Sequence, residues 1–141
     1  AKYEYWYDEI EPRIVVEEFI ESSQEIPKDY KFFVFHGEVK YIQADYGRGT
    51  DNHTRTMYDK EWKAQDFELK YPRGPDGEKP PNLEKMVEIA ETLGEEFDFI
   101  RVDLYNPEDG RIYFGELTAG PGSGIVRLKP KEMDFKIGEY W

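Results

Sequence analysis

Residues 97–118, FDFIRVDLYNPEDGRIYFGELT, contain the pattern that decides the fold. Two β-rich runs, Phe97–Tyr105 and Arg111–Thr118, flank the turn-forming residues 106–110, which predicts an antiparallel hairpin. A four-residue turn over 107–110 would place Arg101 opposite Glu116. In that register the apolar side chains share one face, the expected core face: Ile100, Val102, Leu104, Tyr113 and Leu117.

The other face of this hairpin is the candidate site, since it would carry Arg101, Asp103, Phe114, Glu116 and Thr118. A slip by one residue would mix the two faces, and burial opposes that. Asp103 and Glu116 would then lie diagonally across neighbouring strands, within reach of one hard cation. Composition alone favours a plainer alternative, a solvated face with an ion pair between Arg101 and Glu116. The Gly-rich loop Gly120–Gly124 follows directly, and either binds an anion through its amides or forms an ordinary turn.

The rest of the chain predicts an α+β fold, a mainly antiparallel sheet with packed helices. An apolar stripe at helical spacing predicts a helix over Leu83–Leu93, with Asn82 as N-cap and Gly94 as its stop. Short helices are expected over residues 1–10 and around Lys131–Gly138. The expected strands are Ile14–Ile20 (buried), Tyr30–Phe35, Val39–Tyr46 and the edge strand His53–Tyr58. No repeat or linker divides the chain, so residues 1–141 are expected to form a single domain.

Composition excludes several classes of function. The 141 residues carry 19 Lys and Arg against 31 Asp and Glu, a net charge of −12, which disfavours nucleic acids and anionic membrane surfaces as partners. With no cysteine and two histidines, any metal is expected to be a hard cation such as Mg²⁺ bound by oxygen atoms. No apolar run is long enough for membrane insertion and no signal peptide is visible, so a cytoplasmic location is expected.

Several segments together resemble the TupA-like family of the ATP-grasp superfamily. They are EPRIVVEEFIE (11–21), DYKFFVFHGEVKYIQ (29–43), RVDLYN (101–106) and IYFGELT (112–118), followed by Gly120-Pro121-Gly122. The resemblance covers nearly the whole chain and implies the fold of the C-terminal subdomain of ATP-grasp proteins. Thr118 stands where the wider superfamily has Asn, and Ala119 where an aromatic residue is common, so the third metal ligand and the pocket wall differ from the wider pattern.

The resemblance also implies roles for individual residues. Asp103, Glu116 and Thr118 would hold Mg²⁺ on the phosphates of ATP, and Arg101 would be the catalytic residue that steadies the acyl phosphate or oxyanion. The nucleotide would be bound by a hinge strand, a ribose-binding carboxylate and loop amides: Glu17, Glu18, Phe19 and Ile20, then Glu25, then Gly122 and Ser123. Glu17 and Glu18 are adjacent in a strand, so only one of them can face the ligand.

The family has a further N-terminal region with a lysine-bearing, Gly-rich lid, and nothing before Tyr3 supplies it here. We therefore expect half of a two-part site, with ATP and Mg²⁺ bound only beside the N-terminal part of the same protein, a second chain or another copy. The implied function is the C-terminal catalytic portion of a carboxylate–amine ligase of cell-surface polysaccharide or teichuronopeptide synthesis. The alternative is a non-catalytic binding or structural module derived from the ATP-grasp fold, which binds a partner or assembles with copies of itself. Lys31 and Arg55 could contact phosphate or a substrate carboxylate, and ordinary ion pairing explains them equally well.

Overall fold

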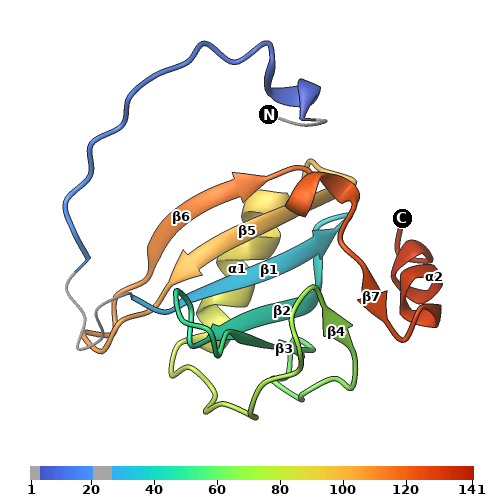
Figure 1. Cartoon of the computed structure of the whole chain (residues 1–141). Coiled ribbons are helices and arrows are strands. Elements are labelled where there is room, and N and C mark those ends of the chain that lie inside the picture. The colour runs from blue at the N-terminus through green and yellow to red at the C-terminus, as the bar shows by residue number, and fades with distance from the viewer. Residues whose placement is uncertain (1–3, 21–26) are drawn as a thin grey trace.

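The computed structural model describes residues 4–20 and 27–141, and its centre is a five-stranded antiparallel sheet in the order β3-β2-β1-β5-β6 (Figure 1). The strands are β1 (Asp29–Phe35), β2 (Glu38–Tyr46), β3 (Thr54–Tyr58), β5 (Phe99–Tyr105) and β6 (Tyr113–Thr118). His36 and Gly37 form the two-residue turn between β1 and β2, both in left-handed conformation (φ 47° and 77°), as such a hairpin requires. The α+β prediction and the edge position of β3 are confirmed.

Helix α1 (Leu83–Gly94) covers one face of the sheet (Figure 1). The predicted stripe forms the contact, since Leu83, Met86 and Ala90 are buried against the apolar side chains of β1, β2 and β5. Asn82 is the N-cap residue, as predicted, but its side chain makes no capping hydrogen bond and instead donates to the carbonyl of Gly110 (2.8 Å). Helix α1 ends at Gly94, as predicted. A Cβ at this position would approach Val34 Cγ1 to 2.5 Å, so Gly94 also permits close packing of α1 on β1.

Gly94→Ala should therefore lower the free energy of unfolding by about 1–3 kcal/mol, the usual cost of overpacking a core. Chemical denaturation would measure the loss. Gly138→Ala is the matched control, because Gly138 ends the other helix with open space around it, and we expect no comparable loss there. Equal stability of the two variants would mean that α1 does not press on Val34.

The opposite face of the sheet is only partly covered. The short ribbon of β4 (Glu68–Leu69) and β7 (Leu128–Lys129) and the helix α2 (Glu132–Gly138) lie over its β2–β3 side (Figure 1). Tyr41, Met57 and Phe67 form a second buried cluster there, joined by Leu128, Met133 and Ile137. The predicted C-terminal helix is confirmed within one residue. The remaining area of this face, over β1, β5 and β6, carries the charged residues.

The register of the last hairpin differs from the prediction. Arg101 pairs with Thr118, and Glu116 lies directly opposite Asp103. Phe114 pairs with Leu104, so Gly115 is an extra residue in β6, a bulge. A side chain at Gly115 would come within 3.0 Å of the Asp103 carbonyl and the Tyr105 ring, which explains the glycine. The predicted core face holds for Ile100, Val102 and Leu104, but it is wrong for Tyr113, which lies opposite Tyr105.

The strand predicted over Ile14–Ile20 is wrong. Residues 11–20 form an extended segment that pairs with no strand of the described chain and arches away from the sheet (Figure 1). The exposed fractions of Ile14, Val16 and Phe19 are 95%, 91% and 71%. The predicted helix over residues 1–10 is reduced to a single 3₁₀ turn, η1 (Tyr5–Tyr7). Its anchor is the Tyr7 hydroxyl, which accepts a hydrogen bond from the Ala119 amide (3.0 Å). No helix in the described part of the chain has the length and apolar character needed to cross a membrane.

Candidate functional site

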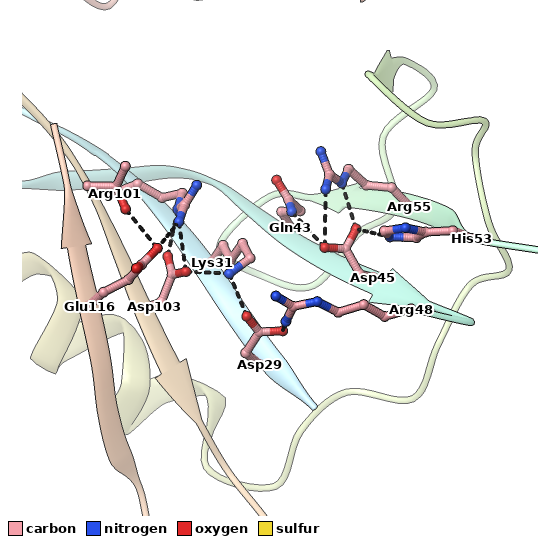
Figure 2. A network of polar contacts seen from close by, with 11 residues as sticks. Asp29, Lys31, Gln43, Asp45, Arg48, His53, Arg55, Arg101, Asp103 and Glu116 are labelled. Carbon is pink, nitrogen blue, oxygen red and sulfur yellow. Dashed lines mark hydrogen bonds and ion pairs between the residues drawn. The ribbon is translucent and has the colours of Figure 1, made fainter. Parts of the chain in front are cut away.

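A row of polar side chains runs across four strands on the open face of the sheet. The strand register places Glu116, Asp103, Lys31 and Gln43 directly beside one another, from β6 through β5 and β1 to β2. Because side chains alternate between faces, these positions all point away from α1. Figure 2 shows Glu116, Asp103 and Lys31 joined with Arg101 in one group of ion pairs, which Asp29 and Arg48 extend at β1. Gln43 contacts Asp45 in a separate group.

Asp103 is the centre of this row. Its Oδ1 accepts from Arg101 Nε (2.6 Å), and its Oδ2 accepts from Arg101 Nη2 (2.8 Å) and from Lys31 Nζ. The side chain is 4% exposed. Burial raises the pKa of the Asp103 carboxyl above its ordinary value, and the hydrogen bonds and charge of Arg101, with the charge of Lys31, offset only part of this effect.

Arg101 also joins Asp103 to Glu116. Its Nη2 lies 2.5 Å from Glu116 Oε1, and the same oxygen accepts from the Thr118 hydroxyl at 3.0 Å. The structure thus brings together four of the five residues that the sequence placed on this face, including the ion pair between Arg101 and Glu116. The prediction is wrong for Phe114, which pairs with Leu104 of the core face. Glu116 differs from Asp103 in its exposure, because its side chain is 59% accessible.

The predicted loop residues are placed less favourably for an anion. Gly122 and Ser123 lie in the 3₁₀ segment η2 (Pro121–Gly124), both with positive φ. The Ser123 amide already donates to the Gly120 carbonyl (2.9 Å), and its hydroxyl donates to Glu4 (3.2 Å). Gly122 lines a cavity, but the Ser123 amide would have to leave its partner before it could bind phosphate.

The donor chemistry of this face fits a hard cation. Asp103, Glu116 and Thr118 offer carboxylate and hydroxyl oxygens from adjacent strands, and Mg²⁺ takes one or two protein carboxylates together with substrate phosphates. Within residues 4–20 and 27–141 no group of three or more acidic or histidine side chains gathers as a cage of protein ligands. A cation held here would compete with Arg101 and Lys31 for the Asp103 oxygens.

Lys31 is the residue whose importance the sequence left open. Its Nζ bridges Asp103 and Asp29, the latter at 2.5 Å, and the side chain is 10% exposed. Asp29 accepts in turn from Arg48 (3.1 Å). A lysine between two buried carboxylates neutralises charge that would otherwise be costly to bury. Lys31 therefore stabilises the fold, in addition to any contact that it makes with a ligand.

A second polar group lies on β2 and β3 (Figure 2). Asp45 accepts from Arg55 Nε (2.6 Å) and Nη2 (3.2 Å) and from the Gln43 amide (3.0 Å), and His53 Nε2 is 3.3 Å from the same carboxylate. Burial alone would raise the pKa of Asp45, but the hydrogen bonds and charge of Arg55 outweigh it and hold the pKa below its ordinary value. Arg55 is therefore an ion-paired residue, which confirms the interpretation of ordinary ion pairing.

Asp45→Asn should lower the free energy of unfolding at pH 7 by about 1.5–3 kcal/mol, the usual value of hydrogen bonds to a charged group. A carboxyl with a depressed pKa stabilises the fold above its unfolded pKa, near 3.8, and loses that contribution as the pH falls through its folded pKa. The difference between wild type and variant should therefore shrink in acid. Denaturation at pH 7 and pH 3 measures it. A difference that stays constant with pH would contradict the prediction.

Two cavities border the charged row. The first, about 420 Å³, lies between the row and the extended segment, and is lined by residues 17–20, by Asp103 and Glu116, and by Lys31 and Arg48. The predicted hinge residues Glu17, Glu18, Phe19 and Ile20 thus share a cavity with the two acids. The second, about 380 Å³, contains Lys31, Arg101 and Gly122 with apolar walls from the sheet and α2. Lys31 lines both cavities. The predicted ribose contact, Glu25, lies outside the described residues.

Lys70 is a cation that the sequence reasoning missed. It follows β4 and lines the second cavity and a neighbouring one of about 490 Å³. It makes no ion pair with a carboxylate in the described parts of the chain, and its φ is +69°. Nothing in the composition or spacing of the sequence marks this position, because the strained backbone and the cavities become visible only in three dimensions.

The comparison with family models gives one match. A model described as TupA-like ATPgrasp matches residues 1–141, the full length of the sequence. No curated protein and no solved structure matches.

Proposed function

The chain belongs to the TupA-like ATP-grasp family, and we propose that it is the C-terminal catalytic portion of an ATP- and Mg²⁺-dependent carboxylate–amine ligase. The observation that carries the proposal is the direct pairing of Asp103 and Glu116 at a cavity whose opposite wall is residues 17–20. The carboxylate oxygens suit the metal ion of a metal–nucleotide complex, and the extended backbone segment at the same cavity suits its nucleotide. By family likeness we assign the product to cell-surface polysaccharide or teichuronopeptide synthesis.

We assign the roles of the residues by family likeness, and their positions are compatible with these roles. Asp103 and Glu116, with Thr118, would hold Mg²⁺, which when bound supplies neutralisation of the phosphate charge. Arg101 shares its guanidinium between the two acids and also lines the second cavity, where it would stabilise an anionic intermediate. Lys70, without a carboxylate partner in the described residues, would contact the anion from the other end of that cavity.

We infer that the site is completed by an N-terminal region of the same protein or by a second chain. Ile14, Val16 and Phe19 expose a run of apolar side chains, and within residues 4–20 and 27–141 no strand lies beside it, which suits a partner strand. The net charge of −12 also repels nucleotide, so further cations are needed for tight binding. A second copy that covers the same segment would give the alternative, a self-assembling module without catalysis.

Titration calorimetry with Mg²⁺ and a non-hydrolysable ATP analogue tests the proposal. We expect weak binding by this chain alone and clearly tighter binding once the N-terminal region is present in the same chain or in trans. Sedimentation of the chain alone measures its oligomeric state. A stable oligomer is required if the chain is a self-assembling module, and it distinguishes that alternative from the ligase portion. No Mg²⁺-dependent nucleotide binding in either form would overturn the proposed function, and tight binding by the chain alone would overturn the two-part site.

A further inference from the structure

The backbone at Lys70 forms an unusual turn. The Tyr71 amide donates to the Leu69 carbonyl (2.8 Å), which closes a three-residue turn around Lys70 at φ +69°. This form of γ-turn is rare and strained, and a left-handed conformation is uncommon for a residue with a side chain. Such strain persists only where neighbouring contacts hold it, and it concentrates at functional sites.

Arg55 supplies most of those contacts. Its Nη1 donates to the Leu69 carbonyl (3.1 Å), its amide donates to the Pro72 carbonyl (3.0 Å), and its own carbonyl accepts from Gly74 (3.0 Å). These bonds hold the chain on both sides of Lys70. The Arg55 side chain is itself fixed by the two bonds to Asp45, which is 5% exposed.

The ring of Tyr71 adds a second contact to the same turn. His53 stacks on it with ring centroids 3.9 Å apart, and Arg55 Cζ lies 4.9 Å from its centroid. Lys70 Nζ is 5.0 Å from the same centroid. The ring therefore connects the lysine to the β3 residues, and the Lys70 amide adds a bond to the Arg127 carbonyl (3.2 Å) on the β7 side.

We infer that the Asp45–Arg55 ion pair and Tyr71 are positioning residues for Lys70, and that they aim its ammonium group at an anion in the second cavity. Arg55 lines that cavity too, but its charge is used by Asp45 and its Nη1 by the Leu69 carbonyl, whereas the charge of Lys70 faces no carboxylate in the described chain. The identity of the anion as phosphate rests on the proposed function; the support of the turn by Arg55 does not.

An NMR titration of this chain with inorganic tripolyphosphate at low salt tests the anion contact. Lys70→Ala should weaken binding by about tenfold, the loss of one charge-assisted hydrogen bond. Lys85→Ala is the control, because it removes the same charge from α1 on the other face of the sheet. Equal affinities for these two variants, or no binding by wild type, would overturn the anion contact.

A double-mutant cycle tests the positioning. Arg55→Lys keeps the charge but loses the fork that holds both Asp45 and Leu69, and should weaken tripolyphosphate binding about as much as Lys70→Ala. In the Lys70→Ala background the same change should have no further effect, since Arg55 acts through Lys70. Independent, additive losses would overturn the positioning role.

The ¹³Cα and ¹³Cβ shifts of Lys70 report its backbone conformation directly, without any ligand. They should show a left-handed residue in wild type and Lys85→Ala, and should move toward ordinary values in Arg55→Lys. Tyr71→Leu is a milder change and should move the Lys70 shifts in the same direction. It replaces Arg55→Lys in this test if that variant does not fold. Unchanged shifts in a folded variant would overturn the support of the turn. The proposed function is tested separately, by whether Mg²⁺ binding depends on Asp103. Absence of that dependence would contradict the proposed function without affecting the support of the turn by Arg55.

Discussion

Lys31→Met should be among the most destabilising single changes in this protein, with a loss of about 3 kcal/mol in the free energy of unfolding at pH 7. Methionine keeps the volume of the side chain but leaves Asp29 and Asp103, both buried, without the ammonium group that lies between them. The loss is placed at the low end of the range for a broken buried ion pair because Arg48 and Arg101 each retain one of the two acids.

The pH dependence of this variant distinguishes charge from packing. Burial raises the pKa of the Asp103 carboxyl, and the loss of Lys31 removes one of the contributions that lower it. A carboxyl with a raised pKa favours the folded state below its unfolded pKa, near 3.8, and this contribution is lost as the pH rises through the folded pKa. The penalty of Lys31→Met should therefore be smaller at pH 4 than at pH 7. Lys40→Ala on β2 is the control, since its partner Glu38 is half exposed and the loss should stay below about 1 kcal/mol. Equal losses in the two variants would contradict the buried bridge.

The hairpin illustrates how much of the site the sequence could predict. Alternation placed Arg101, Asp103, Glu116 and Thr118 on one face and Ile100, Val102 and Leu104 on the other, and the structure agrees. The exact pairing could not be predicted, because it depends on the bulge at Gly115. A glycine in a strand suggests a bulge, but the need for it comes from the Asp103 carbonyl and the Tyr105 ring, which lie on the neighbouring strand.

The segment 14–20 shows the opposite outcome. Its sequence, IVVEEFI, is as rich in β-branched residues as the true strands, yet it pairs with no strand in the described chain. β-Propensity measures how well side chains fit a half-buried surface, and it cannot indicate which surface that is. The pattern therefore identified a segment suited to pairing, while the partner is decided by contacts outside the segment.

The sequence left the roles of Lys31 and Arg55 open, because a lone cation in a strand has the same sequence signature whether it is paired or not. Their roles depend on partners 72 positions away for Lys31 and 10 for Arg55. Only the register of β1 with β5, and of β2 with β3, brings those carboxylates into contact. Charge pairing across a sheet is thus a consequence of topology that composition does not reveal.

In the proposed ligase, completed by its N-terminal region, Glu116→Gln should abolish Mg²⁺-dependent ADP formation, with a loss of more than about 100-fold, because it removes an oxygen of the proposed metal site at the solvent-facing end of the row. The fold should be unaffected, since the side chain is 59% exposed and its ion pair with Arg101 is partly solvated. Asp103→Asn should lose activity to a similar extent, but it should also destabilise the protein, because Arg101 and Lys31 would remain buried without their shared acid.

The two carboxylate variants therefore give different information, and Glu116→Gln is the cleaner test of the metal. Mn²⁺ binding followed by electron paramagnetic resonance provides a readout besides activity, and it should weaken in Glu116→Gln while the unfolding midpoint stays at the wild-type value. Glu132→Gln on α2 removes one negative charge away from the row and should change neither quantity. Wild-type Mn²⁺ affinity and turnover in Glu116→Gln would mean that the acids on β5 and β6 serve only to hold Arg101, and that the cation site lies elsewhere.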